Sequence, residues 1–157
     1  MEFKEQIRIY QERINTAIPT LLPSSESVPN RLHEAIHYSM NVGGKRLRPL
    51  LALAVFERLG GNAQTLDPMP AAVALECLHT YSLIHDDLPA MDNSDLRRGS
   101  ATCHKAFDEA TAILAGDALL TYPFQLLADH YHPAAPLDGK LVGELARASG
   151  PTKLIGG

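Results

Sequence analysis

The chain has 157 residues, of which 45% are hydrophobic and 20% charged, a composition ordinary for a folded protein with one apolar core. Its formal net charge of -4 argues against nucleic acid as the main partner, because phosphate-backbone binding needs a basic surface. Any site for a phosphorylated ligand is therefore expected to be a local basic cluster.

Helical patterns begin at the N-terminus. Apolar residues recur there at three and four positions, which indicates an amphipathic helix with a stripe of Phe3, Ile7, Tyr10 and Ile14. Pro19, Pro23 and Pro29, with the serines between them, predict a connecting loop. This first helix should therefore end before Pro19.

The rest of the chain repeats the helical signature. Further helices are expected over 30–42, from near 49 to 59, from 69 to about 88, over 104–131 and over 137–149, with a polar loop at 93–102. No stretch alternates as a strand would, and no internal repeat is present. The sequence therefore predicts an all-α protein, an antiparallel helix bundle.

The location of the protein can be inferred from what its N-terminus and apolar runs look like. The N-terminal segment is charged throughout, unlike a secretion signal. The longest unbroken apolar run, 50–56, is far shorter than the roughly 20 residues that span a bilayer. Cys77 and Cys103 are too few for a disulfide framework. We expect a cytoplasmic protein without a membrane span.

Three carboxylates cluster where the apolar fourth helix ends. Asp86 and Asp87 are adjacent, and Asp92 follows after Pro89. Such acids are costly to desolvate, and a helix C-terminus disfavours negative charge, so a hard divalent cation would offset their repulsion. On a straight helix Asp92 would lie about 120° from Asp86, so a kink or loosened turn at Pro89 is expected to bring it back. A solvated helix end is the alternative.

Basic residues form two further clusters. Lys45, Arg46 and Arg48 directly precede a helix N-terminus, where cations are unfavourable unless an anion lies among them. Arg97 and Arg98 follow the aspartates, and the alternative for them is a surface network with Asp92 and Asp95.

Two helical turns before Asp86, on the same helix face, lies His79. This position predicts that His79 lines the same cavity as the aspartates. A core histidine with its hydrogen bonds satisfied is the competing interpretation.

Three segments, GGKRLRP, LHTYSLIHDDLPAMDNSDLRRG and TCHKAFDEATAILAGDALL, resemble the trans-prenyl diphosphate synthases, most closely the bacterial farnesyl diphosphate synthases. The likeness runs from about Arg31 to the last residue. It implies an isoprenoid-synthase helix bundle, of which residues 1–157 would be the N-terminal part of a single domain. Family members are longer and carry a second aspartate-rich motif, so we expect the chain to be truncated and inactive alone.

The resemblance assigns roles to the clustered residues. Lys45, Arg48, His79 and Arg98 would bind isopentenyl diphosphate. The aspartates Asp86, Asp87 and Asp92 would hold Mg²⁺ on an allylic diphosphate, dimethylallyl or geranyl, which Arg97 would also contact. The implied enzyme is a prenyltransferase of isoprenoid biosynthesis, commonly a homodimer, and its reaction is ionisation, attack by the double bond and proton loss.

Product length is set in this family by side-chain bulk just before the first aspartate. Tyr81 and Ser82 occupy those positions, which suggests a short product such as farnesyl diphosphate. Asn93 and Ala101 depart from the usual acidic residue and proline without touching these positions.

Two other classes of protein remain open. A non-catalytic helical partner could keep one diphosphate site and regulate a full-length synthase. A magnesium-dependent terpene cyclase is the third possibility, although a cyclase has no need of the isopentenyl diphosphate site that GGKRLRP implies.

Overall fold

The computed structural model describes residues 3–157, and helices form nearly all of its regular structure. The elements are α1 (Phe3–Leu21), α2 (Asn30–Asn41), α3 (Leu47–Arg58), α4 (Met69–Asp86), β1 (Leu96–Arg97), β2 (Ser100–Ala101), α5 (Cys103–Ala106), α6 (Glu109–Tyr131), the 3₁₀ turn η1 (His132–Ala134) and α7 (Leu137–Ser149). The predicted all-α class is confirmed.

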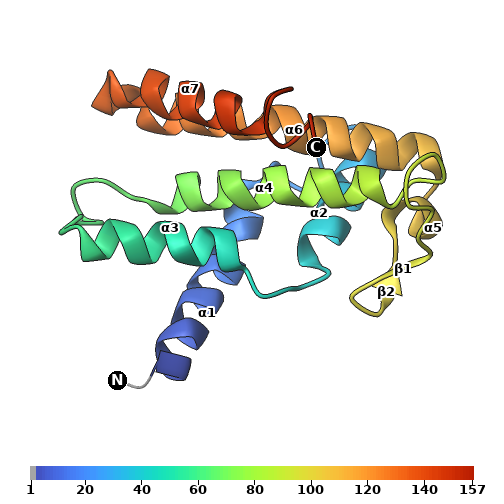
Figure 1. Cartoon of the computed structure of the whole chain (residues 1–157), viewed down its shortest axis with the longest axis horizontal. Coiled ribbons are helices and arrows are strands. Elements are labelled where there is room, and N and C mark those ends of the chain that lie inside the picture. The colour runs from blue at the N-terminus through green and yellow to red at the C-terminus, as the bar shows by residue number, and fades with distance from the viewer. Residues whose placement is uncertain (1–2) are drawn as a thin grey trace.

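The long helices stack in layers around α4. Figure 1 shows α4 between α3 on one side and α6 with α7 on the other, and successive helices of this set run in opposite directions. Helix α4 packs against α6, α3, α1 and α2. A helix covered on several sides must be apolar around most of its circumference, which explains the near-continuous apolar sequence of α4.

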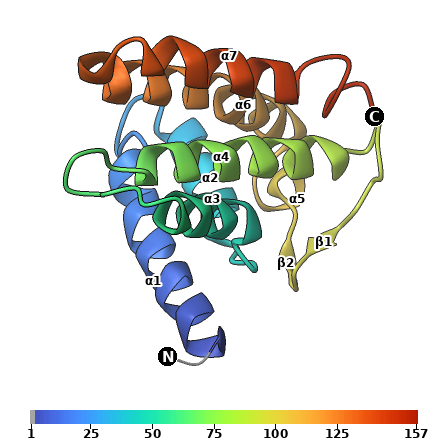
Figure 2. The same ribbon diagram turned by 60° about the vertical axis from the view of Figure 1, so that its left-hand side comes forward.

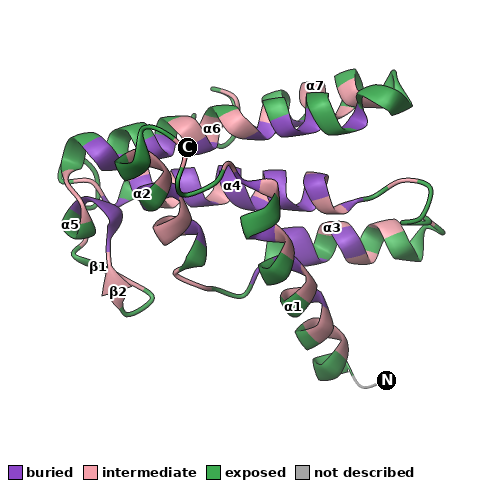
Figure 3. Cartoon of the chain, turned by 180° about the vertical axis from the view of Figure 1, so that it is seen from behind, coloured by how far each residue is buried: buried purple, intermediate pink, exposed green. Residues whose placement is uncertain are grey.

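The core gathers where these layers meet. Buried residues concentrate along α4 and on the inner faces of its neighbours (Figure 3). Ile14, Met40, Leu53, Val73 and Leu119 come from five different helices, and each is 1% exposed or less. Burial of one such side chain contributes about 1.5–3 kcal/mol relative to leaving it in water. The core therefore fixes how α1, α2, α3 and α6 are arranged around α4.

One segment, Glu109–Ala134, is long and apolar enough to cross a membrane by length and composition. Core helices of soluble proteins pass the same test, so this is weak evidence for a span. Helix α6, which makes up most of the segment, packs against α4, α2, α5 and α7. That packing is the arrangement of a core helix.

Helix boundaries differ from the predictions at the end of α1 and before α6. Helix α1 continues through Pro19 to Leu21 instead of ending before it, and Ile14, Ile18 and Leu22 stay buried along one face. The predicted helix over 104–131 is interrupted: α5 ends at Ala106, and α6 begins after Asp108. The Asp108 carboxylate accepts a hydrogen bond from the backbone N–H of Thr111 at 2.7 Å, which caps the new helix.

The predicted polar loop at 93–102 contains a short antiparallel hairpin. Leu96 pairs with Ala101 and Arg97 with Ser100, and Gly99 has φ +83° in the turn between the strands. Figure 2 shows this hairpin at the same end of the molecule as the C-terminal end of α4. The hairpin therefore carries Arg97 to Asp87 at the end of α4.

A candidate diphosphate-binding cleft

The aspartates lie where α4 stops, and the helix stops earlier than predicted. Its last residue is Asp86, and Pro89 lies in the turns that follow instead of kinking a continuing helix. The N–H of Asp92 donates to the carbonyl of Asp86 at 2.7 Å, and that of Ser94 donates to the carbonyl of Asp87 at 3.1 Å. These bonds fold the chain back on itself, so Asp92 lies beside Asp86.

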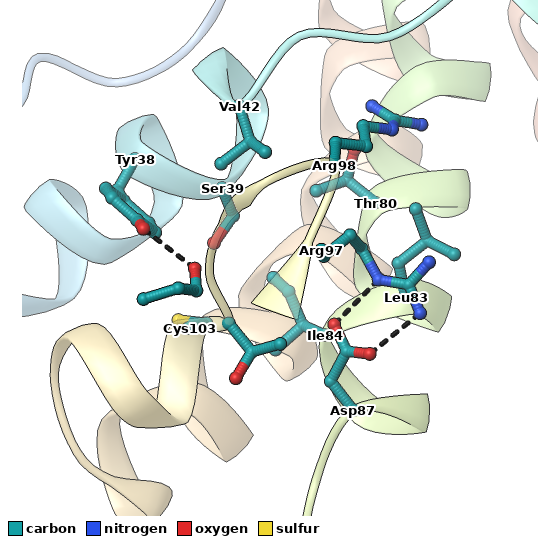
Figure 4. A pocket seen from close by; sticks show the side chains of 12 residues that line it. Tyr38, Ser39, Val42, Thr80, Leu83, Ile84, Asp87, Arg97, Arg98 and Cys103 are labelled. Atoms are coloured by element: carbon teal, nitrogen blue, oxygen red, sulfur yellow. Dashed lines mark hydrogen bonds and ion pairs between the residues drawn. The ribbon is translucent and has the colours of Figure 1, made fainter. Parts of the chain in front are cut away.

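The three carboxylates have different surroundings. Asp86 and Asp92 are exposed, whereas the Asp87 side chain is only 3% exposed. Arg97 donates two hydrogen bonds to Asp87, both of 2.7 Å, in a forked pair (Figure 4). This pairing raises the pKa of Arg97, and the negative charges of Asp86 and Asp92 raise it further. All three carboxylates therefore act on one guanidinium.

The observed ion pairs differ from the surface network considered as an alternative. Arg97 pairs with the buried Asp87, not with Asp92 or Asp95. Asp95 pairs instead with Lys105, at 2.9 Å. A pair with Asp95 or Asp92 would have stayed in water and contributed little, whereas Asp87 is removed from solvent and holds Arg97 in one orientation.

The cations before and within α3 line a groove of about 600 Å³. Its walls include four of the predicted substrate-binding residues: Lys45, Arg48, His79 and Arg98. The groove thus joins the start of α3, the middle of α4 and the hairpin. Of the four cations that line this cavity, Arg46 is paired with Glu76, and the other three create the local positive field that the acidic chain as a whole lacks.

His79 is half-buried in this wall. Desolvation lowers the pKa of its imidazole below the ordinary value of 6.5, and the nearby charge of Arg48 lowers it further, followed by those of Arg98 and Arg97. Glu76 acts in the opposite direction. A neutral imidazole at pH 7 follows, and it can donate a hydrogen bond to a ligand oxygen without adding charge.

Arg97 belongs to the acidic cluster, and the next residue, Arg98, belongs to the basic groove. Arg98 has φ +54°, and Figure 4 shows its guanidinium extending away from the Asp87–Arg97 pair. It donates to the carbonyl of Gly43 at the edge of the groove. Asp87, Arg97 and Arg98 also line a small cavity of about 30 Å³ between α2, α4 and the hairpin.

The residues predicted to set product length lie on α4 before the aspartates. Tyr81 is buried and packs edge-on against His85, at 5.7 Å between ring centroids. The Ser82 hydroxyl donates to the carbonyl of His79 at 2.8 Å, so it is bonded to its own helix.

The oxygen donors fit a magnesium ion. Asp86 and Asp92 are exposed, adjacent and anionic, and Mg²⁺ takes one or two carboxylates while keeping waters and substrate phosphate oxygens as its other ligands. Among residues 3–157, no group of three or more His, Cys, Asp or Glu side chains is arranged to hold a metal by itself. The site therefore fits an ion shared with a phosphate better than one enclosed by protein.

Sequence reasoning missed the residues that hold the groove together. Arg46 was grouped with the free cations, yet its side chain is 3% exposed and forms an ion pair with the equally buried Glu76. A glutamate within the apolar run AAVALECL was the available signal, because a buried carboxylate requires a partner.

Comparison with known proteins gives the family. The sequence profile of the polyprenyl synthetase family matches residues 29–149. The chain belongs to the polyprenyl synthetase family. A farnesyl diphosphate synthase of Micrococcus luteus is 50% identical over 154 residues, covering 98% of this chain and 52% of that protein. The large subunit 1 of a heterodimeric geranylgeranyl pyrophosphate synthase of Arabidopsis thaliana is 47% identical and covers 99% and 42%.

Solved structures of the family have the same fold. A geranyltransferase from Legionella pneumophila superposes with a TM-score of 0.90 at 40% identity, over 98% of this chain and 54% of that one. An FPP/GFPP synthase from Zymomonas mobilis gives 0.88 at 41%, over 98% and 55%. The chain spans about half the length of the polyprenyl synthetases it matches.

Proposed function

We propose that this chain is part of a magnesium-dependent prenyltransferase that joins an allylic diphosphate, dimethylallyl or geranyl, to isopentenyl diphosphate. The product we propose is short, farnesyl diphosphate, because the large Tyr81 side chain stands one turn before the aspartates. One arrangement carries the proposal: Arg97 pairs with Asp87 in the acidic cluster, and the next residue, Arg98, lines the basic groove. A single-substrate terpene cyclase would have no use for the basic groove.

The proposed reaction depends on charged groups that stabilise the departing diphosphate. The allylic C–O bond breaks and its electron pair leaves with the diphosphate, the isopentenyl double bond attacks the resulting cation, and a proton leaves the new C–C product. Asp86 and Asp92 would hold Mg²⁺, which supplies charge for the departing diphosphate. Asp87, the third predicted ligand, is bonded to Arg97, and would have to share its oxygens to bind metal as well.

The basic groove would hold the second substrate. Lys45, Arg48 and Arg98 would neutralise the isopentenyl diphosphate, and neutral His79 would donate a hydrogen bond to it. Held there, the homoallylic double bond would lie near the acidic cluster, where the allylic cation would form. Proximity of the two reacting carbons is the main contribution that such a groove makes to rate.

An assay of the complete polypeptide tests the proposal. With Mg²⁺, geranyl diphosphate and isopentenyl diphosphate, Asp86→Ala should lower kcat by about 10² or more, because charge on the leaving group is no longer offset. Arg58→Ala, an exposed cation at the far end of α3, should leave kcat within about twofold. A loss under about tenfold for Asp86→Ala would leave that residue a structural role only.

The assembly and location of the protein are also proposals. We propose a homodimer in the cytoplasm, supported by its likeness to bacterial farnesyl diphosphate synthases. The Arabidopsis relative is named as one subunit of a heterodimer. The competing arrangement is therefore a heterodimer, in which this chain would be the non-catalytic helical partner of a full-length synthase. Mass determination of the purified complex separates the two.

A further inference from the structure

The middle cation of the motif that begins α3 points into the protein. Lys45 and Arg48 are exposed beside the groove, whereas Arg46 between them is 4% exposed. Its guanidinium donates three hydrogen bonds: 2.9 Å to Asn15 Oδ1 on α1, 2.7 Å to the carbonyl of Met40 on α2 and 2.9 Å to Glu76 Oε1 on α4. One side chain therefore ties the start of α3 to three other helices.

The backbone at this position is held in an unfavourable shape. Arg46 has φ +48° and ψ +37°, a left-handed conformation that costs a residue with a side chain about 1 kcal/mol or more. Its carbonyl accepts the first bond of α3, from the N–H of Leu50 at 3.0 Å. The neighbouring carbonyl of Lys45 accepts from Gln11 Nε2 on α1, also at 3.0 Å. The turn that directs Lys45 and Arg48 into the groove is thus imposed by contacts with other helices.

Stability alone does not account for a buried arginine here. Two apolar side chains of similar volume commonly stabilise a fold as well as a buried ion pair does. Such side chains cannot, however, bond Asn15, the Met40 carbonyl and Glu76 at once, which only the planar five-donor guanidinium does. What the arginine adds is a fixed position for the loop.

We propose that Arg46, with Glu76 as its counterion, is a positioning residue of the diphosphate groove. Both side chains lie in the wall of the groove, and Arg46 acts there through its bonds to other helices, which set the geometry of the site. This inference rests on the proposed function, because it takes the groove to be a diphosphate site. It predicts that removing the Arg46–Glu76 pair weakens the binding of diphosphate in the groove even where the fold remains stable.

The test uses inorganic pyrophosphate with EDTA present, so that only the basic groove is measured. Calorimetric titration compares the wild type with R46M/E76M, which removes the buried pair without changing net charge. The matched control is R13M/E57M, which removes an ion pair of the same residue types that also bridges two helices, α1 and α3, but is about 40% exposed. Circular dichroism and thermal melts establish that each variant is folded.

We expect R46M/E76M to melt cooperatively and to bind pyrophosphate about tenfold or more weaker, while R13M/E57M stays within about twofold of the wild type. Equal affinity in a folded R46M/E76M would overturn the inference and leave the proposed function standing. A wild type that does not bind pyrophosphate would overturn the diphosphate groove itself. Should R46M/E76M not fold, Arg46→Lys keeps the charge but not the three-way fork, and unchanged binding in that variant would contradict the role.

Discussion

At the scale of single residues, the cleft depends on how closely side chains approach the backbone. Gly44, at φ +132°, lies against Arg98: a Cβ added there would overlap the arginine's guanidinium. The same guanidinium bonds the carbonyl of Gly43. A residue without a side chain is therefore what lets the hairpin cation reach the loop before α3.

Gly44→Ala should move Arg98 out of the groove. We expect pyrophosphate affinity in EDTA to fall about threefold to tenfold, because one of three permanent charges is displaced. Gly43→Ala is the control: its φ of +88° imposes similar backbone strain, but nothing lies within 4 Å of the added carbon. If both variants bind equally weakly, backbone strain and not the Arg98 contact is the cause.

His79 provides a titration that reports on the groove. The pKa of His79 in the folded protein lies below the 6.5 of the unfolded chain. As pH falls below 6.5 the unfolded chain therefore binds a proton at this residue more readily than the folded protein does, and the free energy of unfolding decreases. A bound anion stabilises the imidazolium, so pyrophosphate should raise the His79 pKa. Proton NMR of the imidazole signals, with His79→Gln to assign them, measures both values. A pKa unchanged by saturating pyrophosphate would place the anion elsewhere.

At the scale of elements, the sequence predicted helices well and the joints between them less well. The periodicity of apolar residues defined α7 to the residue, over Leu137–Ser149, because nothing interrupts its amphipathic face. Pro19 misled the prediction since tertiary burial of Ile18 and Leu22 outweighs one lost backbone bond. The break before α6 was missed although Asp108, followed by Glu109, is a good N-cap signal.

For the site as well, local features could be predicted from the sequence, whereas contacts between distant segments could not. The family resemblance grouped Lys45, Arg48 and His79 at one site, and all three line the basic groove. Helix spacing alone instead predicted that His79 shares a cavity with the aspartates, and the groove that it lines contains none of them, because the chain turns away after α4. Which arginine pairs with which aspartate was not predictable, because it depends on the hairpin that folds the chain back after α4. The buried Arg46–Glu76 pair required the packing of α4 against α3, which no local pattern encodes.

The cap of α6 is predicted to be sensitive to pH. Hydrogen bonding from the Thr111 N–H, followed by that from Arg31, lowers the pKa of Asp108 to about 2 from 3.8. The stabilisation is therefore present above pH 3.8 and is lost as pH falls toward 2. Asp108→Asn keeps a capping oxygen but loses the charge paired with Arg31. It should melt below the wild type at pH 7, and the two melting temperatures should converge near pH 2.

Gly116 sets how closely α4 approaches α6. A Cβ at this position would overlap the ring of His85, which bonds the carbonyl of Ile113 at 3.1 Å. Alanine is the better helix former by about 1 kcal/mol, but overpacking costs about 1–3 kcal/mol, so Gly116→Ala should lower the melting temperature. Gly139→Ala, in α7 with open space around it, should raise it slightly. Stabilisation in both variants would show that His85 moves aside freely.

At the scale of the whole molecule, the helices leave one face of the bundle apolar. Leu47, Leu51 and Val55 recur every fourth residue on α3, and each is more than half exposed. Such a stripe is unusual on an isolated surface helix.

The residues described here place one acidic cluster near the basic groove, and within that cluster Asp87 is already bound to Arg97.

The 157-residue chain is therefore expected to bind without turning over. Pyrophosphate should bind in EDTA, because the groove is lined by residues of this chain, from the loop before α3, from α3, from α4 and from the hairpin. Geranyl and isopentenyl diphosphates with Mg²⁺ should give no product. The exposed carboxylates of Asp86 and Asp92 can hold Mg²⁺ on one side of the departing diphosphate, whereas its charge must be offset on several sides. Radiolabelled isopentenyl diphosphate measures incorporation, and a complete farnesyl diphosphate synthase assayed in parallel shows that the reagents are active. Product formed by this chain alone would mean that Asp86, Asp92 and the two arginines suffice for ionisation.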